Sequence, residues 1–238
     1  VARPDKKTIT IEDPIEYAIK GIEQTQVSED KGYSFATGLR AIVRQDPDII
    51  LVGEIRDKET AEIGMQAALT GHQVFSTIHA NDSVGAIPRL LDMGVQKETI
   101  GPAINIIMAQ RLVRRLCEKC KKPKEIDAVF ALKIQKYIEA LPVRASREGL
   151  SANGLCEPVG CSACNETGYY GRVALFELFP VTADAEKVIM VGVGAADLYA
   201  FAVARGMVTM QQDGVLKVLH GITTIAEIEG ATGPIAFI

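Results

Sequence analysis

Three short runs of apolar, largely β-branched residues constrain the fold of this chain most strongly. They cover residues 8–11, 48–52 and 73–78. Segments with helical spacing lie between them: residues 33–44 are amphipathic, and a second helix is predicted to begin after Asp57 and end before Gly71. Strands that alternate with helices predict an α/β fold built on a parallel sheet.

The second and third runs are predicted to be buried strands, because a continuous apolar run is typical of a strand covered on both faces. A further helix is expected to begin at Asn81 or Asp82 and to end near Gly94. Pro88 lies inside that segment and predicts a kink.

Polar residues follow each of the three predicted strands directly. Since ligands of open parallel sheets bind beyond the carboxyl ends of the strands, these residues are expected to line one site. Any one of them alone is more simply a solvated loop residue, whereas the set together indicates an active site. Its members are Glu12, Asp13 and Glu16 after the first strand, Glu54 and Arg56 after the second, and His79 after the third.

The second strand and Glu54 are similar to a Walker B segment, in which an acidic residue holds Mg²⁺ beside nucleotide phosphates. Glu16 is predicted to polarise the attacking water, and His79 to hydrogen-bond the terminal phosphate. Arg40 and Arg44, four residues apart on one helix, either contact phosphate or form surface salt bridges with acids such as Asp48 or Glu54. His72 and His220 stand at predicted helix ends, and we interpret both as structural.

Two Cys-x-x-Cys pairs predict a structural zinc site with four thiolate ligands. The ligands are Cys117, Cys120, Cys161 and Cys164, and Cys156 is left over. Seven basic and two acidic residues lie between Arg111 and Glu125, and we interpret the excess positive charge as balancing the zinc–thiolate centre. Nucleic acid is an unlikely partner of this cluster, because no aromatic residue interleaves with the basic ones.

The composition excludes several broad classes of protein. Apolar residues make up 47% of the chain and charged residues 24%, with a formal net charge of −4, as in ordinary globular domains rather than disordered chains or polycations. No apolar run reaches the roughly 18–20 residues needed to cross a bilayer. The odd number of cysteines does not fit a secreted disulfide framework and indicates a reducing compartment.

The remaining sequence predicts three parts, with boundaries at 1–116, 117–165 and 166–238. The first is an ATPase core, the second a tetracysteine zinc subdomain that includes a helix over 125–141, and the third a helical region that follows a β-like run at 172–179. Capping boxes are expected at Thr209–Gln212 and Thr224–Glu227. Residues 230–238 carry no pattern.

With these motifs assembled, the chain resembles the secretion ATPase family of type II secretion and type IV pilus assembly. The acidic box lies at 10–17, the arginine and Walker B block at 39–57, the histidine box at 70–79 and the tetracysteine segment at 110–164. The resemblance runs from about residue 8 to residue 181. The cysteine pairs favour the assembly and export branch over the retraction ATPases.

The resemblance implies a RecA-like, P-loop type ATPase that uses ATP and Mg²⁺ and works as a ring, usually a hexamer. It implies a location on the cytoplasmic face of the bacterial inner membrane, with an inner-membrane platform protein and a cytoplasmic adaptor as partners. In the family, the position of Glu16 is the catalytic base, that of Glu54 is tied to Mg²⁺, and that of His79 senses the γ-phosphate.

One family motif is missing: no Gly-x-x-x-x-Gly-Lys-Ser/Thr loop occurs in these 238 residues. The chain is therefore expected to be the carboxyl-terminal part of a longer protein and to hydrolyse little ATP by itself. Two other hypotheses remain open. One is a non-catalytic, zinc-stapled scaffold on an ATPase-like fold, and the other is a DNA-uptake ATPase.

Overall fold

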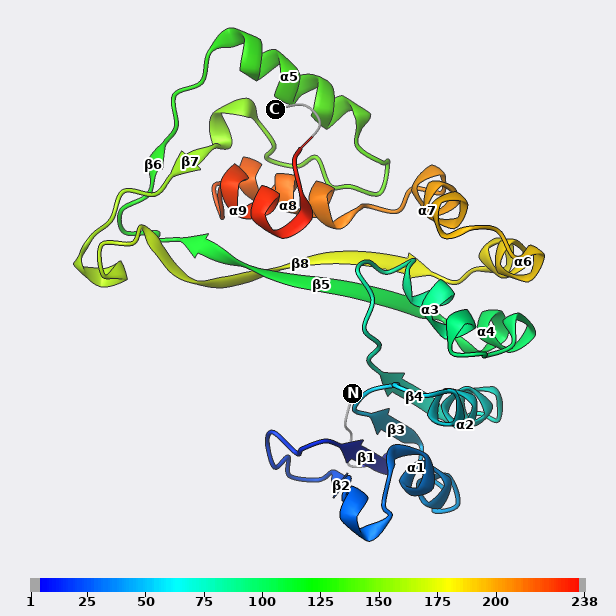
Figure 1. Cartoon of the computed structure of the whole chain (residues 1–238). Coiled ribbons are helices and arrows are strands. Elements are labelled where there is room, and N and C mark those ends of the chain that lie inside the picture. Colours follow the sequence, from blue (N-terminus) through cyan, green and yellow to red (C-terminus); the bar gives the residue numbers. More distant parts are fainter. Residues whose placement is uncertain (1–4, 236–238) are drawn as a thin grey trace. The chain divides into compact units, whose positions relative to one another are not determined.

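A computed structural model shows a mixed α/β chain, of which residues 5–235 are described, apart from the side chain of Ala152. The chain divides into two compact units. The first contains residues up to 107 together with 180–198, and the second contains residues 108–179 together with the rest of the chain from 199 (Figure 1). The division into three domains at 1–116, 117–165 and 166–238 stays a prediction.

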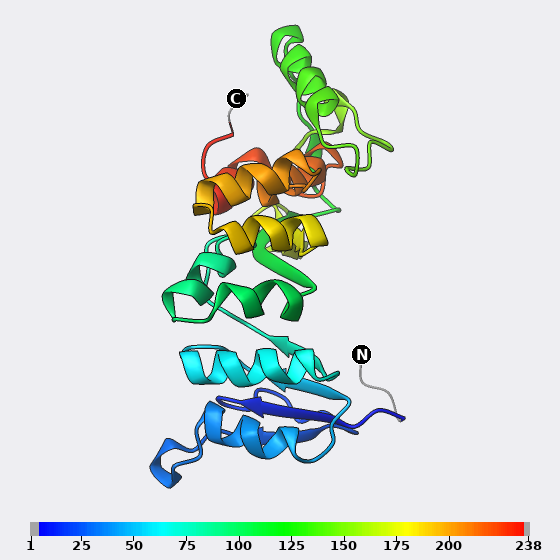
Figure 2. The same ribbon diagram turned by 90° about the vertical axis from the view of Figure 1, so that its right-hand side faces the viewer.

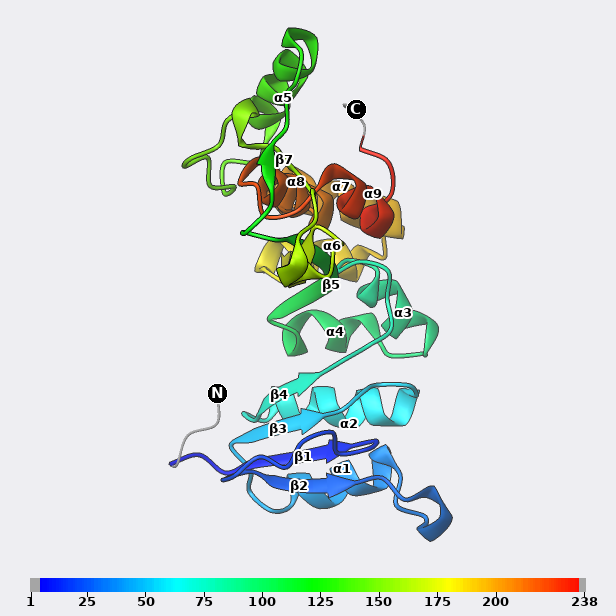
Figure 3. The ribbon, with the colours of Figure 1, turned by 90° about the vertical axis from the view of Figure 1, so that its left-hand side faces the viewer.

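The first unit contains a four-stranded parallel sheet in the order β2-β1-β3-β4. The strands are β1 (Thr8–Glu12), β2 (Glu23–Gln26), β3 (Ile49–Val52) and β4 (Gln73–Ser76). Three of them were predicted, and β2 was not, because its sequence Glu-Gln-Thr-Gln carries no apolar pattern. Figure 3 shows the four strands edge to edge.

Helices α1 (Phe35–Val43) and α2 (Lys58–Leu69) cover one face of this sheet (Figure 2). Alternate residues of β1 and β3 point to this face and join the helices in one apolar core. Gly38 of α1 is required at the contact, because a Cβ there would lie 2.3 Å from Cδ1 of Ile11. The core consists of Ile9, Ile11, Phe35, Leu39, Ile42, Ile50, Val52 and Ala67.

Two expectations for this unit are wrong. The strand at 73–78 is not buried, because β4 is the last strand of the sheet within the described residues, and Phe75 is 37% exposed. The helix expected from Asn81 or Asp82 begins only at Ala86, and Asp82 instead accepts a hydrogen bond from the Gly85 amide at 2.7 Å. Pro88 therefore falls in the first turn, where proline is tolerated, and there is no reason for a kink.

Helices α3 (Ala86–Asp92), α4 (Lys97–Ala103) and α6 (Ala183–Val191) complete the first unit. Helices α4 and α6 pack closely, and a Cβ on Gly101 would lie 2.9 Å from Cγ of Glu186. Helix α4 was missed, because its sequence contains both Gly101 and Pro102, which argue against a helix.

The second unit is built on a two-stranded ribbon of β5 (Ile106–Leu116) and β8 (Tyr169–Pro180). Helices α8 (Met210–Leu219) and α9 (Ile225–Thr232) contribute to its core together with α5 (Ala128–Ala140). Helix α7 (Ala195–Ala204) and a small antiparallel pair, β6 (Lys122–Pro123) and β7 (Cys156–Glu157), are also present. Single 3₁₀ turns lie in this unit at Ala152–Gly154 and Ser162–Cys164, and a further one lies in the first unit at Glu29–Lys31.

The predicted helix starts agree with the structure at most positions. Asp57 caps α2, as predicted, whereas the helix expected over 125–141 begins only at Ala128, after its cap Asp127. The capping box at Thr209–Gln212 is complete. Thr224 caps α9, but the Glu227 side chain contacts Arg114 instead of closing the box. Of the unpatterned segment 230–238, Ile235 is buried in the second core, and residues 236–238 lie outside the described residues.

None of the described helices is long and apolar enough to span a membrane.

Candidate functional site

Glu54 lies directly beyond the carboxyl end of β3, and its side chain is 15% exposed. Its Oε1 is 2.5 Å from Nη2 of Arg56. Its Oε2 is buried and accepts no hydrogen bond from the described residues, and Nε2 of His79 lies 3.5 Å from it. A buried carboxylate oxygen without a hydrogen bond is costly, so this atom is suited to a ligand that binds oxygen.

Arg56 joins the first two strand ends. Besides Glu54, its guanidinium contacts Oδ2 of Asp13 at 3.6 Å, and the hydrogen bond to Glu54 raises the pKa of Arg56. The end of β4 is tied to the same region, because the Thr77 hydroxyl donates to the Gly53 carbonyl at 2.7 Å. The three strand ends therefore meet, as predicted.

Glu12 and Glu16 do not join this contact group. Glu12 is half-buried, and its Oε1 accepts hydrogen bonds from the Thr10 hydroxyl and, at 2.9 Å, from Nε2 of Gln24. Glu16 lies on the loop after β1 with an exposed side chain.

The two helix arginines are separated from the acidic residues after β1 and β3. Arg40 forms an ion pair with Glu59 of α2, and Arg44 is the exposed C-cap residue of α1. Asp48, suggested above as a partner, pairs with Lys6 at 2.7 Å, which lowers the pKa of Asp48. Of the two alternatives given for the arginines, the surface salt bridge therefore applies to Arg40, with Glu59 as the acid in place of Asp48 or Glu54.

The residues at the strand ends fit a nucleotide-bound Mg²⁺. Mg²⁺ prefers carboxylate oxygens and usually keeps several waters, so one buried oxygen of Glu54 without a hydrogen bond from the described residues is an appropriate contribution from the protein. Arg56 and His79 offer positive or hydrogen-bonding groups beside it, which suits phosphate oxygens.

The four predicted zinc ligands come together in the second unit, with all four Sγ atoms within 4.8 Å of one another. Cys117 and Cys161 are 3.9 Å apart, Cys120 and Cys164 3.8 Å, and Cys161 and Cys164 3.8 Å. Four thiolates at about 2.3 Å from a tetrahedral Zn²⁺ are separated by about 3.8 Å, which agrees with these distances. The cluster fits zinc.

Backbone amides stabilise negative charge on this cluster. Cys164 is buried, which opposes ionisation, but the amides of Cys161 and Gly168 donate to its Sγ at 3.2 and 3.3 Å. These hydrogen bonds lower the pKa of Cys164 to about 7. Burial instead raises the pKa of Cys120 to about 11.

Gly168 makes the second cysteine turn possible. Its φ is +75°, and a Cβ there would lie 2.5 Å from Cβ of Pro158. Both the left-handed backbone conformation and the lack of space therefore exclude a side chain at this position. Its carbonyl accepts a hydrogen bond from the Cys117 amide at 3.0 Å, which connects the two cysteine pairs.

The basic cluster beside the cysteines is partly neutralised by carboxylates, which the sequence interpretation did not foresee. Arg114 pairs with Glu227, and Arg115 and Lys121 pair with Glu118. Lys121 also donates to the Gly221 carbonyl at 2.9 Å. At least three of the seven basic residues therefore have carboxylate partners and contribute less free charge to a zinc–thiolate centre.

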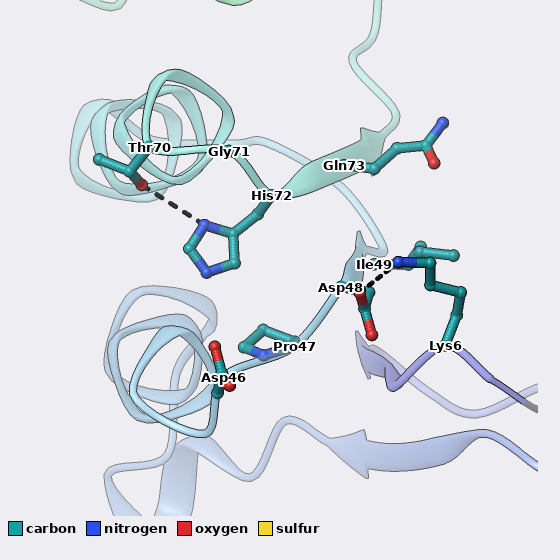
Figure 4. Close-up of a pocket in the computed structure, with 9 residues that line it drawn as sticks. All are labelled: Lys6, Asp46, Pro47, Asp48, Ile49, Thr70, Gly71, His72 and Gln73. Atoms are coloured by element: carbon teal, nitrogen blue, oxygen red, sulfur yellow. Dashed lines mark hydrogen bonds and ion pairs between the residues drawn. The ribbon is translucent and has the colours of Figure 1, made fainter.

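A cavity of about 710 Å³ lies at the opposite, amino-terminal end of the strands (Figure 4). Nδ1 of His72 contacts the Ala67 carbonyl at 3.0 Å near the end of α2, in agreement with the structural role predicted for His72. The cavity is lined by Lys6, Asp46, Pro47, Asp48, Ile49, Thr70, Gly71, His72 and Gln73.

Sequence reasoning missed the polar residues that hold the acidic box, namely Thr10, Gln24 and Gln26. A signal was available for the two glutamines, because they stand at i and i+2 in a short polar segment and alternate residues of a strand share a face.

The sequence matches the family described as type II/IV secretion system protein over residues 1–230. The chain belongs to that family. It is 44% identical over 234 residues to the type IV pilus assembly ATPase PilB of Myxococcus xanthus, covering 98% of this chain and 40% of that protein. It is 44% identical over 225 residues to the type II secretion system protein E of Pectobacterium carotovorum, covering 94% and 42%.

Among solved structures, the chain resembles the pilus retraction motor PilT, crystallised with bound ADP. The TM-score is 0.66 at 27% identity, covering 96% of this chain and 53% of that one. The ATPase DotB of Legionella pneumophila shares the fold, with a TM-score of 0.63 at 21% identity, covering 94% and 51%. The RecA-like assignment is confirmed. This member of the secretion system family spans less than half the length of the two curated relatives named above.

Proposed function

We propose that this chain forms the hydrolytic and zinc-bearing part of an ATP-hydrolysing motor that powers pilus assembly or type II secretion. The observation that carries this proposal is the buried Oε2 of Glu54, which accepts no hydrogen bond from the described residues and lies at a strand end shared with Arg56 and His79. The phosphate-binding loop would come from residues outside the 238, since they contain no such sequence.

In this proposal each strand end contributes one role. Mg²⁺, held beside Glu54 through its water shell, would neutralise charge on the phosphates. Glu16, after β1, would accept a proton from the attacking water, and its exposed side chain is free to turn toward that water. His79, after β4, would donate a hydrogen bond to the terminal phosphate.

The role of Glu16 is tested by Glu16→Gln in the full-length protein. Turnover is expected to fall at least a hundredfold, because general-base catalysis contributes about 10²–10⁴-fold, while ATP binding stays within about twofold. Steady-state hydrolysis and nucleotide titration measure the two quantities. Glu23→Gln, a nearby exposed acid on β2, is the control and should keep wild-type turnover. Unchanged turnover in Glu16→Gln would exclude it as the base.

We further propose that the four cysteines hold one structural Zn²⁺. Metal analysis of the chain purified without chelator should find about one zinc per chain, because a closed tetrahedral site takes one ion. The double variant Cys117→Ser/Cys120→Ser should lose it, and Cys156→Ser should retain it. Protein without zinc under these conditions would contradict the site.

The partners and location carried over from the family are proposals as well. We propose a homo-oligomer, a hexamer as in the family, that acts at the cytoplasmic face of the inner membrane with a platform protein and an adaptor. Sedimentation of the full-length protein with a non-hydrolysable ATP analogue tests the assembly, and a monomer under all conditions would contradict it.

A further inference from the structure

The connection between β1 and β2 is unusual for neighbouring parallel strands, because it contains no helix. Residues 13–22 are an irregular loop, whereas parallel neighbours are usually joined by a helical crossover. Since Glu23 is paired with Ile9, β2 begins level with the early part of β1, so the loop must run back along the sheet from the carboxyl end. Glu16 lies in this loop.

An irregular loop on a sheet needs hydrogen-bond partners for its backbone other than those of a helix. Two glutamines of β2 supply them. Gln24 and Gln26 are paired in register with Thr10 and Glu12, so all four share one face of the sheet. This face is the one opposite Ile9 and Ile11, which pack against the helices.

Gln24 makes three hydrogen bonds from one amide. Its Oε1 accepts from the Ile19 amide at 2.7 Å. Its Nε2 donates to the Tyr17 carbonyl at 3.1 Å and to Oε1 of Glu12 at 2.9 Å. The partners determine the orientation of the amide, because a backbone N–H faces Oε1 and two acceptors face Nε2.

Gln26 holds the other side of the loop. Its Oε1 lies 3.3 Å from the Ile15 amide, which donates to it. The backbone is thus anchored at Ile15 before Glu16 and at Tyr17 after it. Glu12 is fixed in turn by Thr10, so Gln24 connects the loop to the end of the central strand β1.

We propose that Gln24 is the positioning residue of the acidic box, and that it sets where the Glu16 carboxylate stands by holding the backbone on its carboxyl-terminal side. This inference rests on the proposed role of Glu16 as catalytic base. Catalytic geometry is sensitive to such support, since a misplacement of about 1 Å lowers turnover by about a hundredfold.

The direct test is Gln24→Leu in the full-length protein, which keeps the side-chain size and removes all three hydrogen bonds. We expect kcat to fall at least about tenfold while KM for ATP stays within about twofold, because Gln24 acts on the base rather than on nucleotide binding. Glu23→Leu, on the same strand with its side chain on the opposite sheet face, is the matched control and should leave both parameters unchanged.

A second variant separates positioning from simple loss of structure. In Gln24→Glu, a carboxylate replaces the donor beside Glu12, and repulsion between the two favours protonation of one of them as pH falls. The protonated side chain again offers one donor and one acceptor. The kcat of Gln24→Glu relative to wild type is therefore expected to rise about threefold or more from pH 8 to pH 6. A pH-independent ratio would overturn the proposal.

The double variant with Glu16→Gln distinguishes failure of this inference from failure of the proposed function. If Glu16→Gln lowers turnover at least a hundredfold and adding Gln24→Leu lowers the remaining turnover no further, Gln24 acts through Glu16. If Glu16→Gln abolishes turnover while Gln24→Leu alone keeps a wild-type kcat, the positioning role is wrong and the base assignment stands. If Glu16→Gln keeps turnover, both are wrong.

A measurement on the present chain needs no activity. Hydrogen exchange at the Ile19 amide should be slowed in wild type and accelerated at least about tenfold in Gln24→Leu, because its acceptor is removed. Exchange at the β3 amides serves as the internal control and should not change. Equal exchange at Ile19 in the two proteins would overturn the proposal.

Discussion

At the residue scale, Arg114 and Glu227 form the most connected ion pair described in the second unit. Nε and Nη2 of Arg114 donate to Oε1 of Glu227 at 3.0 and 2.6 Å, and the Arg114 amide donates to Oε2 at 2.9 Å. The guanidinium also lies 4.1 Å from the centre of the Tyr169 ring. This contact joins β5, next to Cys117, to the first turn of α9.

The pair makes stability depend on pH. The hydrogen bond from Arg114 lowers the pKa of Glu227 below its usual 4.5, so the contribution of the pair is complete above that pH and is lost as pH falls through the lowered value. Glu227→Gln should lower the free energy of unfolding by about 1 kcal/mol at pH 7, because the pair is partly exposed, and by less at pH 4.

Denaturant titration of both proteins between pH 4 and 7 measures this difference. Zinc release at low pH affects both proteins alike, so the comparison is made between variant and wild type. A difference that grows as pH falls would contradict the assignment.

At the element scale, side-chain caps determine where several helices begin. Oδ1 of Asp57 accepts from the Thr60 amide at 2.8 Å, and Oδ2 accepts from the Thr60 hydroxyl at 2.9 Å. The cap fixes the start of α2 at Lys58, six residues after the end of β3 at Val52, so Glu54 and Arg56 lie on a short connection whose two ends are both held.

Removing this cap should destabilise the first unit. Asp57→Ala is expected to lower the free energy of unfolding by about 1 kcal/mol, the usual effect of losing an N-cap. Lys58→Ala, next in sequence, is the control. It removes only a surface pair with Glu62, and the expected change is under about 0.5 kcal/mol. Equal effects of the two variants in thermal unfolding would contradict the capping role.

At the scale of the whole molecule, the described residues form an apolar core in each of the two units. One lies between the parallel sheet and its helices, and the other joins the β5–β8 ribbon to α5, α8 and α9. The cysteine cluster belongs to the second unit, where it connects the end of β5 with the turn before β8.

Metal removal should therefore act on one unit. Treatment with a strong chelator is expected to increase hydrogen exchange in the ribbon and around the cysteines, because a structural zinc contributes directly to folding free energy. The sheet of β1–β4 should keep its protection. Loss of protection in both units together would contradict two independent cores.

Much of the fold could be predicted because its signals are local. The runs that became β1 and β3, the helix spacing of α1 and the cap at Asp57 depend on neighbouring residues only. Among the strands, the failures were β4, whose apolar sequence indicated burial, and β2, whose polar sequence indicated no strand. In both cases the partners of the strand, rather than its own residues, decide its environment.

The sequence by itself determined which chemical groups are present: carboxylates and an imidazole after three strands, and two pairs of thiols with zinc spacing. Only the tertiary structure decided which of them meet. It joined Glu54 to Arg56 and His79, assigned Arg40 to Glu59, and folded the acidic loop back onto Gln24. The physical reason is that hydrogen bonds and ion pairs act over about 3–4 Å in space. The residues that form them can be far apart in the chain, as Arg114 and Glu227 are.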